Sequence, residues 1–435
     1  MSERDRVQLL LWRANLGATP AEVDTATALG YAAAVEQVLG NAALDLPNAS
    51  APVLAAWPVY PVGGTTTEKQ NYQNAVNARN SADMTKIQPW WCNQFYTRRD
   101  FPLQEHMALF WHDHFANGND AINRPPYLLD QNQLFRQKGM GNFLDLFVSV
   151  AKGPAMLVYL NGKDNVKGHA NENFARESME LFSLGIGNYT EADVREAARA
   201  CTGYTLADDG TVAFNAARFD NTAKTILGQT ANFTLDTYCQ LIVGNAATAH
   251  YLCTKLFQWF VADDPTEAEL APMIAAWNTT SGDIRSVLRA MFNGGAFTLP
   301  RALANHLKNP VQWLIGALRG LSITTVPDAQ IQSLLVAQGL TLFYPPNVGG
   351  WQSGPAWVSP TNQILRFNQA SVVLGTLAAF SGAATTASMQ LLTDQLGNLP
   401  IPPDVQTQLV TLGNRTDGQR VVAQVVLAGP EYQAS

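Results

Sequence analysis

The segment His106-Met-Ala-Leu-Phe-Trp-His-Asp-His-Phe115 opens the stretch that decides the fold of this chain, and the stretch closes near Thr202. Four of the six histidines lie in it, with a dense set of Glu, Asp and Arg, although only 14% of the chain is charged. Charged side chains that gather in an apolar sequence either pair inside the fold or form a site. We expect the rest of the molecule to be organised around this stretch.

Length and composition indicate a globular protein with a large core. The chain has 435 residues, of which 47% are hydrophobic, and a net charge of −7. The negative charge and the lack of any Lys/Arg run argue against a nucleic-acid-binding protein. No apolar run approaches the roughly 18–20 residues that span a membrane, so we expect no membrane span. The sequence predicts no oligomeric state.

The amino terminus and the cysteines bear on the compartment. Met1-Ser-Glu-Arg-Asp-Arg6 has mixed charge and no signal-peptide core, which predicts a cytoplasmic protein as encoded, or an exported one if a leader was removed. The four cysteines are too few and too scattered for a disulfide framework or a zinc knuckle. We expect buried free thiols at Cys92, Cys201, Cys239 and Cys253.

Helical periodicity dominates the chain and predicts an all-α fold. Thr19-Pro-Ala-Glu22 is a strong helix start, with Thr as N-cap, Pro in the first turn and Glu closing a capping box. The one β signal is Asp208-Asp-Gly210, a turn that predicts a small hairpin near 205–214. We predict a single multi-helical unit over 1–435, with a Pro/Gly/Ala-rich surface loop at about 45–64.

Several helices bear on the organisation of the chain. Spacing predicts helices over 103–114 and 171–184, and a helix capped by Thr190 that stops at Gly203. It also predicts two separate helices before them, over 68–79 and 90–99. Towards the carboxyl terminus it predicts helices over 301–319 and 361–380.

His112 and His114 are candidate metal ligands, with Glu177 as a carboxylate that could join them. On an ideal helix the two imidazoles point about 200° apart and cannot chelate one ion. If the helix ended near Trp111, an irregular backbone could let them converge on a divalent metal ion. The other interpretation is structural: both imidazoles hydrogen-bond to carbonyls and favour the negative end of the helix dipole. The sequence leaves a metal cofactor open.

Glu172, Arg176 and Glu180 descend one edge of the helix after Asn171, with Glu177 beside them. Alternating Glu and Arg at this spacing is typical of a solvated, salt-bridged face. The same helix is rich in small and apolar residues, which favours close packing, and the charges would then form an internal network. Such a network either fixes the architecture or presents a carboxylate for acid–base catalysis. We therefore consider His112, Glu172, Arg176 and Glu177 as candidate catalytic residues.

Two loops are candidates for substrate binding. The loop from Asn161 to His169 carries Lys163, Lys167 and His169 at a helix start and could hold an anion, but it lacks the glycine spacing of a P-loop. A second loop presents three aromatic rings on a Pro-Gly framework and could stack on a sugar. Its alternative role is to plug a gap between helices with buried tryptophan. These rings belong to Tyr344, Trp351 and Trp357.

At its motifs the chain resembles the DUF1800 family, a group of bacterial proteins of unknown function. The resemblance covers nearly the whole chain. It implies a helical fold and frequent export in relatives, and it carries over no activity. The motifs that carry it are Leu10-Leu-Trp-Arg-Ala-Asn-Leu-Gly-Ala-Thr-Pro20, Phe110-Trp-His-Asp-His-Phe-Ala116, Asn171-Glu-Asn-Phe-Ala-Arg-Glu177, Glu180-Leu-Phe-Ser-Leu-Gly-Ile-Gly-Asn-Tyr-Thr-Glu191, Val194-Arg-Glu-Ala-Ala-Arg-Ala200, Tyr344-Pro-Pro-Asn-Val-Gly-Gly-Trp351 and Gly429-Pro-Glu-Tyr-Gln433.

Two positions depart from the pattern that the resemblance implies. Relatives commonly have His-Asp where this chain has Phe219-Asp220, and Tyr-Leu-Asp where it has Tyr159-Leu-Asn161. If either missing polar group belongs to a site in the family, that site is altered here.

The leading functional hypothesis is an enzyme, a hydrolase or a lyase, that cleaves a polymeric or glycan substrate with carboxylate or metal assistance. Glu177 or Glu172 would be the base or a metal ligand, His112 a ligand or proton carrier, and Arg176 an anion holder. The alternative is a scaffold or binding protein whose charged helices are structural. A carbohydrate or another polymer is the expected partner in the first case.

Overall fold

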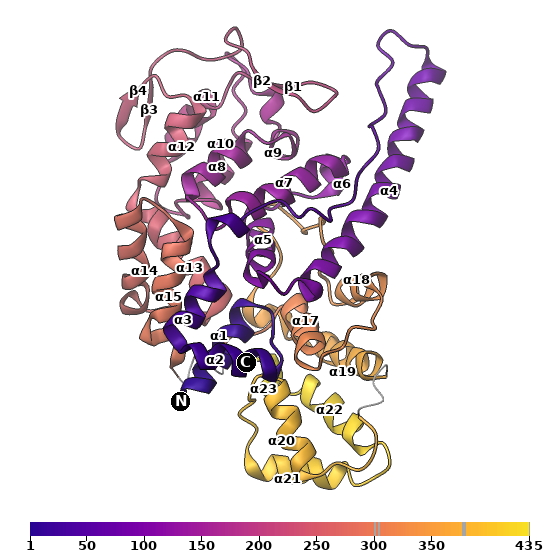
Figure 1. The fold of residues 1–435 in the computed structure, drawn as a ribbon. Coiled ribbons are helices and arrows are strands. Elements are labelled where there is room, and N and C mark those ends of the chain that lie inside the picture. Colours follow the sequence, from indigo (N-terminus) through magenta and orange to yellow (C-terminus); the bar gives the residue numbers. More distant parts are fainter. Residues whose placement is uncertain (300–301, 303–304, 376–379, 435) are drawn as a thin grey trace.

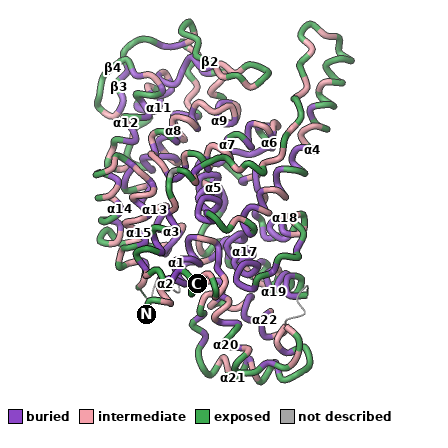
Figure 2. The backbone as a smooth tube through the Cα atoms, in the orientation of Figure 1, coloured by how far each residue is buried: buried purple, intermediate pink, exposed green. Residues whose placement is uncertain are grey.

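Helix α5 (Pro102–His114) runs through the middle of the molecule (Figure 1). The computed structural model describes residues 1–299, 302, 305–375 and 380–434. Every residue of α5 except Asp113 is buried, and the tube of this helix is purple along its length in Figure 2. A helix that is buried on all sides needs other elements on all sides. The first helix of the predicted central stretch therefore lies in the core of the fold.

The amino-terminal helices pack beside α5. They are α1 (Glu3–Ala14), α2 (Pro20–Leu29), α3 (Tyr31–Leu39) and the short 3-10 helix η1 (Ala42–Leu44). The predicted capping box of α2 is confirmed: Glu22 N–H donates to Thr19 Oγ1 at 3.2 Å, and Thr19 N–H donates to the Glu22 carboxylate at 2.8 Å.

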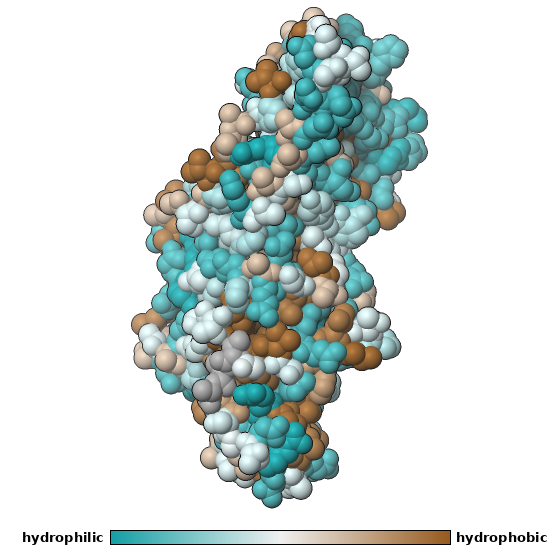
Figure 3. Space-filling view, turned by 90° about the vertical axis from the view of Figure 1, so that its right-hand side faces the viewer, coloured by the Kyte–Doolittle hydropathy of each residue, from teal (hydrophilic) through white to brown (hydrophobic). Residues whose placement is uncertain are grey.

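Helix α4 (Thr66–Thr97) projects from the body as the longest helix of the described residues (Figure 1). Two separate helices were predicted here, and that prediction is wrong, because the helix continues through Pro89. Proline leaves the carbonyl of Thr85 without a helical donor, but Thr85 is exposed, so water can satisfy that carbonyl. The loop at 45–64 runs along the projecting half, where the Tyr60 and Tyr72 rings lie 5.2 Å apart. Figure 3 shows this part as mainly hydrophilic.

The charged stretch folds into short helices above α5. The bounds are α6 (Asn119–Ile122), α7 (Pro125–Lys138), α8 (Phe143–Ala151), α9 (Pro154–Tyr159), η2 (Gly162–Asp164), α10 (Asn173–Glu180) and α11 (Glu191–Ala200). Helix α10 is shorter than the predicted 171–184, because the N–H groups of Leu184 and Gly185 both turn back to the carbonyl of Met179. Thr190 caps α11 as predicted.

The strands form two separate antiparallel pairs. The predicted hairpin is confirmed as β1 (Tyr204–Leu206) with β2 (Val212–Phe214), and Tyr204 lies opposite Phe214. A second hairpin, β3 (Lys224–Ile226) with β4 (Gln229–Ala231), was not predicted. Its two turn residues, Leu227 and Gly228, both have positive φ. Leucine is unusual in such a turn, so this segment lacks the usual residues that signal a hairpin.

The carboxyl-terminal half returns to helices that flank and extend the core. Parts of the predicted helices 301–319 and 361–380 lie outside the described residues. No helix in the described ranges is both long and apolar enough to cross a membrane. The bounds are α12 (Leu235–Val243), α13 (Ala246–Phe260), α14 (Glu267–Thr280), α15 (Ile284–Asn293), η3 (Gly295–Thr298), α17 (Pro310–Gly320), α18 (Asp328–Ala337), η4 (Gly354–Trp357), α19 (Pro360–Leu374), α20 (Thr386–Gln395), α21 (Pro403–Leu412), α22 (Gly418–Ala428) and α23 (Pro430–Gln433).

Candidate functional site

His112 and His114 do not converge at the end of α5, because the helix continues to His114. His112 Nε2 accepts a hydrogen bond from Phe343 N–H at 3.2 Å, and burial lowers the pKa of His112 to about 3. His114 Nε2 instead lies 3.1 Å from the carbonyl oxygen of Phe182, and burial lowers its pKa well below the usual value. Each imidazole therefore ties α5 to a different segment.

No three His, Cys, Asp or Glu side chains are grouped to hold a metal ion within the described ranges. The predicted ligand set of His112, His114 and Glu177 therefore has no geometric support. His106, the third histidine of α5, contacts the carbonyl oxygen of Ala14 at 3.1 Å and accepts from Trp259 Nε1 at 2.9 Å.

The predicted charged edge of α10 lies at the surface. Arg176 pairs with Glu172 at 3.0 Å and with Glu191 of α11 at 2.6 Å, and the exposed fractions of these side chains are 33%, 39% and 62%. The two helices do face each other through these charges, but in contact with solvent. This geometry is that of a solvated, salt-bridged face, in which each ion pair contributes little to the stability of the fold.

Glu177 is only partly exposed, and its surroundings differ from those of His112. Burial raises the pKa of Glu177, the nearby Glu180 raises it further, and Arg176 opposes them. Tyr159 lies close enough for the Glu177 charge to raise its pKa. The ring of His112 packs against Trp91, Phe343 and Trp351, and no hydrogen bond or ion pair joins it to Glu177 in the part of the chain that the structure describes. A joint role for them stays a prediction.

The loop of Lys163 and His169 leads into α10. Its backbone is fixed by Asn165, whose Nδ2 donates to the carbonyl of Ala198 and whose Oδ1 accepts from Asn171 N–H, both at 2.9 Å. His169 is exposed and Lys163 partly so. The predicted anion-binding role of these residues stays a prediction.

The two departures from the family pattern lie in ordered surroundings. Lys224 Nζ lies 4.9 Å from the centre of the Phe219 ring and donates to the carbonyl of Asp220 at 2.6 Å. Asn161 adopts a left-handed backbone with φ of 55° where the chain turns from α9 into η2. Both replacements are compatible with the local fold.

A cavity of about 310 Å³ lies beside α5, on the side of Asp113. Four segments and Leu340 line it, and the segments are the end of α5, the end of α13 with Asp263 and Asp264, the segment 306–312, and the loop 349–357. These segments are distant in sequence. The predicted rings of Trp351 and Trp357 line the cavity, whereas the hydroxyl of Tyr344 accepts from Asn119 Nδ2 at 2.9 Å elsewhere.

Asp113 is the acidic group of this cavity that belongs to the Trp-His-Asp-His motif. Its Oδ1 accepts a hydrogen bond from Trp351 N–H at 2.7 Å. Its Oδ2 makes no hydrogen bond with any residue that the structure describes. Burial raises the pKa of Asp113 to about 6, against the opposing effects of Lys255 and of Trp351 N–H. The motif thus presents its aspartate, and not its histidines, to a cavity.

Lys255, Asp263, Asp264 and His306 are the other titratable groups that line the cavity. Burial lowers the pKa of Lys255, and the charge of Asp113 opposes that shift. Burial and the neighbouring Asp264 raise the pKa of Asp263. Perturbed titratable groups that line one cavity are typical of functional sites.

Two glycines let the loop 349–357 approach both carboxylates. Gly350 has φ of 88°, and a Cβ there would overlap Oδ1 of Asp113. Gly354 has φ of 52°, and a Cβ there would lie 2.8 Å from Oδ2 of Asp263. Glycine is required at both positions by backbone conformation and by space.

The cavity walls combine aromatic rings with polar atoms that have no partner. Trp259, Trp351 and Trp357 supply the indole rings. Trp351 is 9% exposed and His306 is 4% exposed, and neither Trp351 Nε1 nor His306 Nδ1 has a hydrogen-bond partner in the described part of the chain. Buried polar atoms of this kind normally form hydrogen bonds. Trp351 Nε1 and His306 Nδ1 are therefore two atoms to which a ligand or a water molecule can bind.

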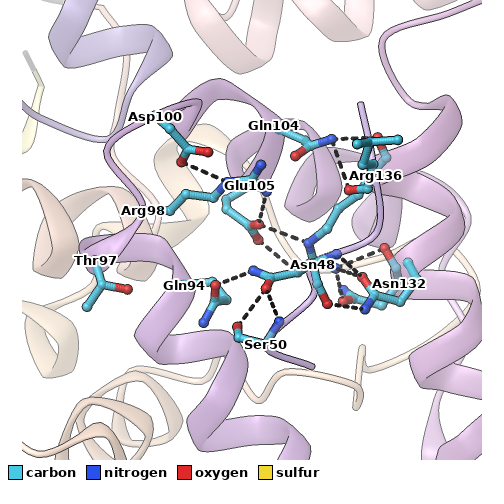
Figure 4. Close-up of polar contacts among 12 residues, drawn as sticks. Asn48, Ser50, Gln94, Thr97, Arg98, Asp100, Gln104, Glu105, Asn132 and Arg136 are labelled. Carbon is cyan, nitrogen blue, oxygen red and sulfur yellow. Dashed lines mark hydrogen bonds and ion pairs between the residues drawn. The ribbon is translucent and has the colours of Figure 1, made fainter. Parts of the chain in front are cut away.

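A second polar cluster lies at the other end of α5, and Figure 4 shows it in close-up. Glu105 accepts from Arg136 Nη2 at 2.6 Å and from Arg98 Nη1 at 3.1 Å. Asn132 accepts from Arg136, and Asn48 donates to Gln94 nearby. Most polar groups of this cluster are satisfied from within, which makes it a structural network.

Sequence reasoning missed most of the residues that line the cavity, among them Lys255, Asp263 and His306. Lys255 and His306 lie in helical or irregular segments with no motif around them. Asp113 belongs to the Trp-His-Asp-His motif, but the candidate site residues were taken from the histidines on either side of it. The signal that could have selected it is the pair of glycines in Gly349-Gly-Trp351, which predicts a close approach to another segment.

Comparisons with known proteins give a family and no activity. A model of the family described as "Protein of unknown function (DUF1800)" matches residues 9–434. Comparison with curated proteins finds no match to the chain, and neither does comparison with solved structures.

Proposed function

The chain belongs to the DUF1800 family, whose description states no activity, and from the cavity beside α5 we propose an enzyme that cleaves a glycan or a related polymer with carboxylate assistance. Asp113 would be the general acid and Asp263 the second carboxylate. The observation that carries the proposal is Asp113 itself: a partly buried carboxyl with a raised pKa and a free oxygen, in a cavity walled by tryptophans.

The chemistry of glycoside cleavage fits this arrangement. Most glycosidases use two carboxyl groups, of which one has a raised pKa and protonates the leaving oxygen while the other acts as base or nucleophile. With a pKa of about 6, Asp113 keeps a useful fraction of its proton near neutral pH. Asp263 lines the same cavity. These groups support hydrolysis more than a metal-assisted reaction.

The indole rings support a sugar or another ring as the bound unit. Trp259, Trp351 and Trp357 offer flat apolar faces beside carboxylates, a combination that suits a ring with C–H bonds and hydroxyls. The unpartnered Nε1 of Trp351 can donate to a ligand oxygen. Trp351 and Trp357 thus keep the substrate-binding role predicted from the sequence.

The alternative, a scaffold or binding protein, is favoured for one region of the molecule. The charges of Glu172, Arg176 and Glu191 are paired with one another at the surface, as expected of structural helices. In this alternative the cavity binds without turnover.

The test incubates the protein with a panel of neutral and uronic-acid-containing oligosaccharides. Cleavage is measured as the release of reducing ends. We expect Asp113→Asn to lower the rate by about 10²–10⁴-fold, the usual loss on removing a general acid, while Arg176→Ala cleaves like the native protein. A lyase would instead give an unsaturated, ultraviolet-absorbing product. Binding of an oligosaccharide without cleavage by the native protein would favour the scaffold alternative. Full activity of Asp113→Asn would refute the assignment of Asp113.

A further inference from the structure

Lys255 brings an amine into the cavity beside α5. It lies in the last turn and a half of α13, and its side chain is partly buried. Within the described ranges Lys255 forms no hydrogen bond and no ion pair, and its one recorded contact is with the Tyr251 ring, whose centre lies 5.6 Å from Nζ. Its amine is therefore not held by a protein acceptor.

The other buried lysines behave differently. Lys224 Nζ donates to the carbonyls of Asp220 and Thr222 and to Asn232 Oδ1. Lys308 Nζ donates to the carbonyl of Tyr432 at 2.6 Å. Burial lowers the pKa of all three lysines, but protein oxygens hold the amines of Lys224 and Lys308 in place. The amine of Lys255 has no such acceptor among the described residues, which leaves it able to attack a ligand.

The walls around Lys255 suit a small organic ligand. Phe110, Trp259, Leu340 and Trp357 are apolar surfaces of the same cavity, which excludes much of the water that would compete for a reactive group. Asp113 lies near enough for its charge to act on Lys255, and its Oδ2 is free to pass a proton. Trp351 Nε1 and His306 Nδ1 provide unpartnered polar atoms.

We propose that Lys255 is a nucleophile that condenses with the aldehyde or ketone carbonyl of a small ligand in this cavity to form an imine. The open-chain form of a reducing sugar belongs to this class of ligand. The inference uses the same cavity as the proposed glycan cleavage but does not depend on that reaction.

The step balances without an oxidant or a reductant. Neutral Nζ attacks the carbonyl carbon, a C–N bond forms, and the carbonyl π pair moves to the oxygen, which takes a proton from the Asp113 carboxyl. The nitrogen then returns a proton to Asp113. A second transfer from Asp113 to the hydroxyl releases water as the C–O bond breaks and the C=N bond forms, which leaves a protonated imine. The imine nitrogen then returns its proton to Asp113, so that amine and carbonyl yield imine and water and Asp113 ends protonated, as it began.

The experiment is reductive trapping on the full chain with glyceraldehyde and sodium cyanoborohydride at pH 7, followed by peptide mass mapping. Exposed Lys69 of α4 is the internal control. We expect Lys255 to be modified at least about tenfold faster than Lys69, in line with a larger fraction of neutral amine. Modification of Lys255 no faster than that of Lys69 would overturn the proposal.

Two variants complete the test. Lys255→Arg should lose the fast modification and keep the slow one at Lys69, and a fast modification that persists would place the nucleophile elsewhere. Asp113→Asn should slow trapping at Lys255 only, and an unchanged rate would remove Asp113 from the step. If Lys255→Arg does not fold, the rate ratio within the native chain decides alone. Trapping does not require cleavage, so failure of the glycan proposal would be seen separately.

Discussion

Helix α5 carries two carboxylates, Glu105 and Asp113, whose surroundings are opposite. Burial raises the pKa of Glu105, but Arg136 and Arg98 outweigh it, so the net shift is downward. Burial raises the pKa of Asp113 to about 6, because Lys255 and one backbone N–H compensate only in part. The comparison teaches that burial alone does not mark a functional carboxylate. Glu105 is compensated and holds the architecture, whereas Asp113 is left available to a ligand.

The largest effect is expected from removing a cation that pairs with Glu105. Arg136→Ala leaves Glu105, which is 1% exposed, with the single cation Arg98. Loss of one partner of a buried ion pair costs about 3–5 kcal/mol, so we expect that decrease in the free energy of unfolding, measured by urea denaturation. Arg415→Ala, which removes an exposed pair with Asp417, is the matched control and should change little. A loss below about 1 kcal/mol for Arg136→Ala would contradict the structural role.

At Asp113, a substitution that removes the charge is expected to raise the free energy of unfolding. The pKa of Asp113 is about 6 in the folded protein, and its ordinary value is 3.8. The protonated carboxyl therefore contributes stability at pH values below 3.8, and this contribution is lost as the pH rises through 6. Asp113→Asn should therefore be more stable than the native protein at pH 8, by about 2–3 kcal/mol.

At pH 4 this gain should nearly vanish, and urea denaturation at both pH values checks it. Glu105 has the reverse dependence: its stability is present above its ordinary pKa and is lost as pH falls through its lowered folded pKa. A destabilised Asp113→Asn protein at pH 8 would remove the contrast between the two carboxylates.

An effect of intermediate size is expected from the glycines of the loop 349–357. Gly350→Ala forces a Cβ against Asp113 in a backbone with φ of 88°. We expect a loss of about 2–3 kcal/mol, more than the roughly 1–2 kcal/mol of a left-handed backbone alone. Gly63→Ala is the control, because its φ is 73° and no atom lies within 4 Å. Equal losses in thermal or urea unfolding would show that the contact with Asp113 does not matter.

The smallest effect is expected at the surface pairs of α10. Arg176→Ala should lower the free energy of unfolding by less than about 1 kcal/mol, and added salt should reduce the difference further. A larger loss that does not respond to salt would mean that this network is more like that of Glu105 than its exposure indicates.

Local signals in the sequence were enough for much of the fold. The capping residues Thr19 and Thr190 fixed two helix starts, and Asp208-Asp-Gly210 fixed a hairpin, because the interactions involved are only a few residues apart. The predicted separation into helices over 68–79 and 90–99 was wrong, because one helix continues through Pro89, where the freed carbonyl faces water. The hairpin at Leu227 was missed because its turn lacks the usual residues.

The site could be predicted only in part. Helix geometry separated His112 from His114, which contact different segments, and the Pro-Gly loop pointed to Trp351 and Trp357, which line the cavity. It could not select Asp113, because α5 is covered on every side and no amphipathic pattern tells which face meets a cavity. That face is decided by Lys255 and Trp351, more than 100 residues away in sequence.

The most direct measurement is the pKa of Asp113 in the folded protein. The chain is labelled with ¹³C at the aspartate carboxyl carbons, the Asp113 resonance is assigned by its loss in Asp113→Asn, and its chemical shift is followed with pH. The account predicts a midpoint near 6. A midpoint at or below the ordinary aspartate value of about 3.9 would contradict it, because Asp113 would then be as well compensated as Glu105 and could not serve as the acid of the cavity.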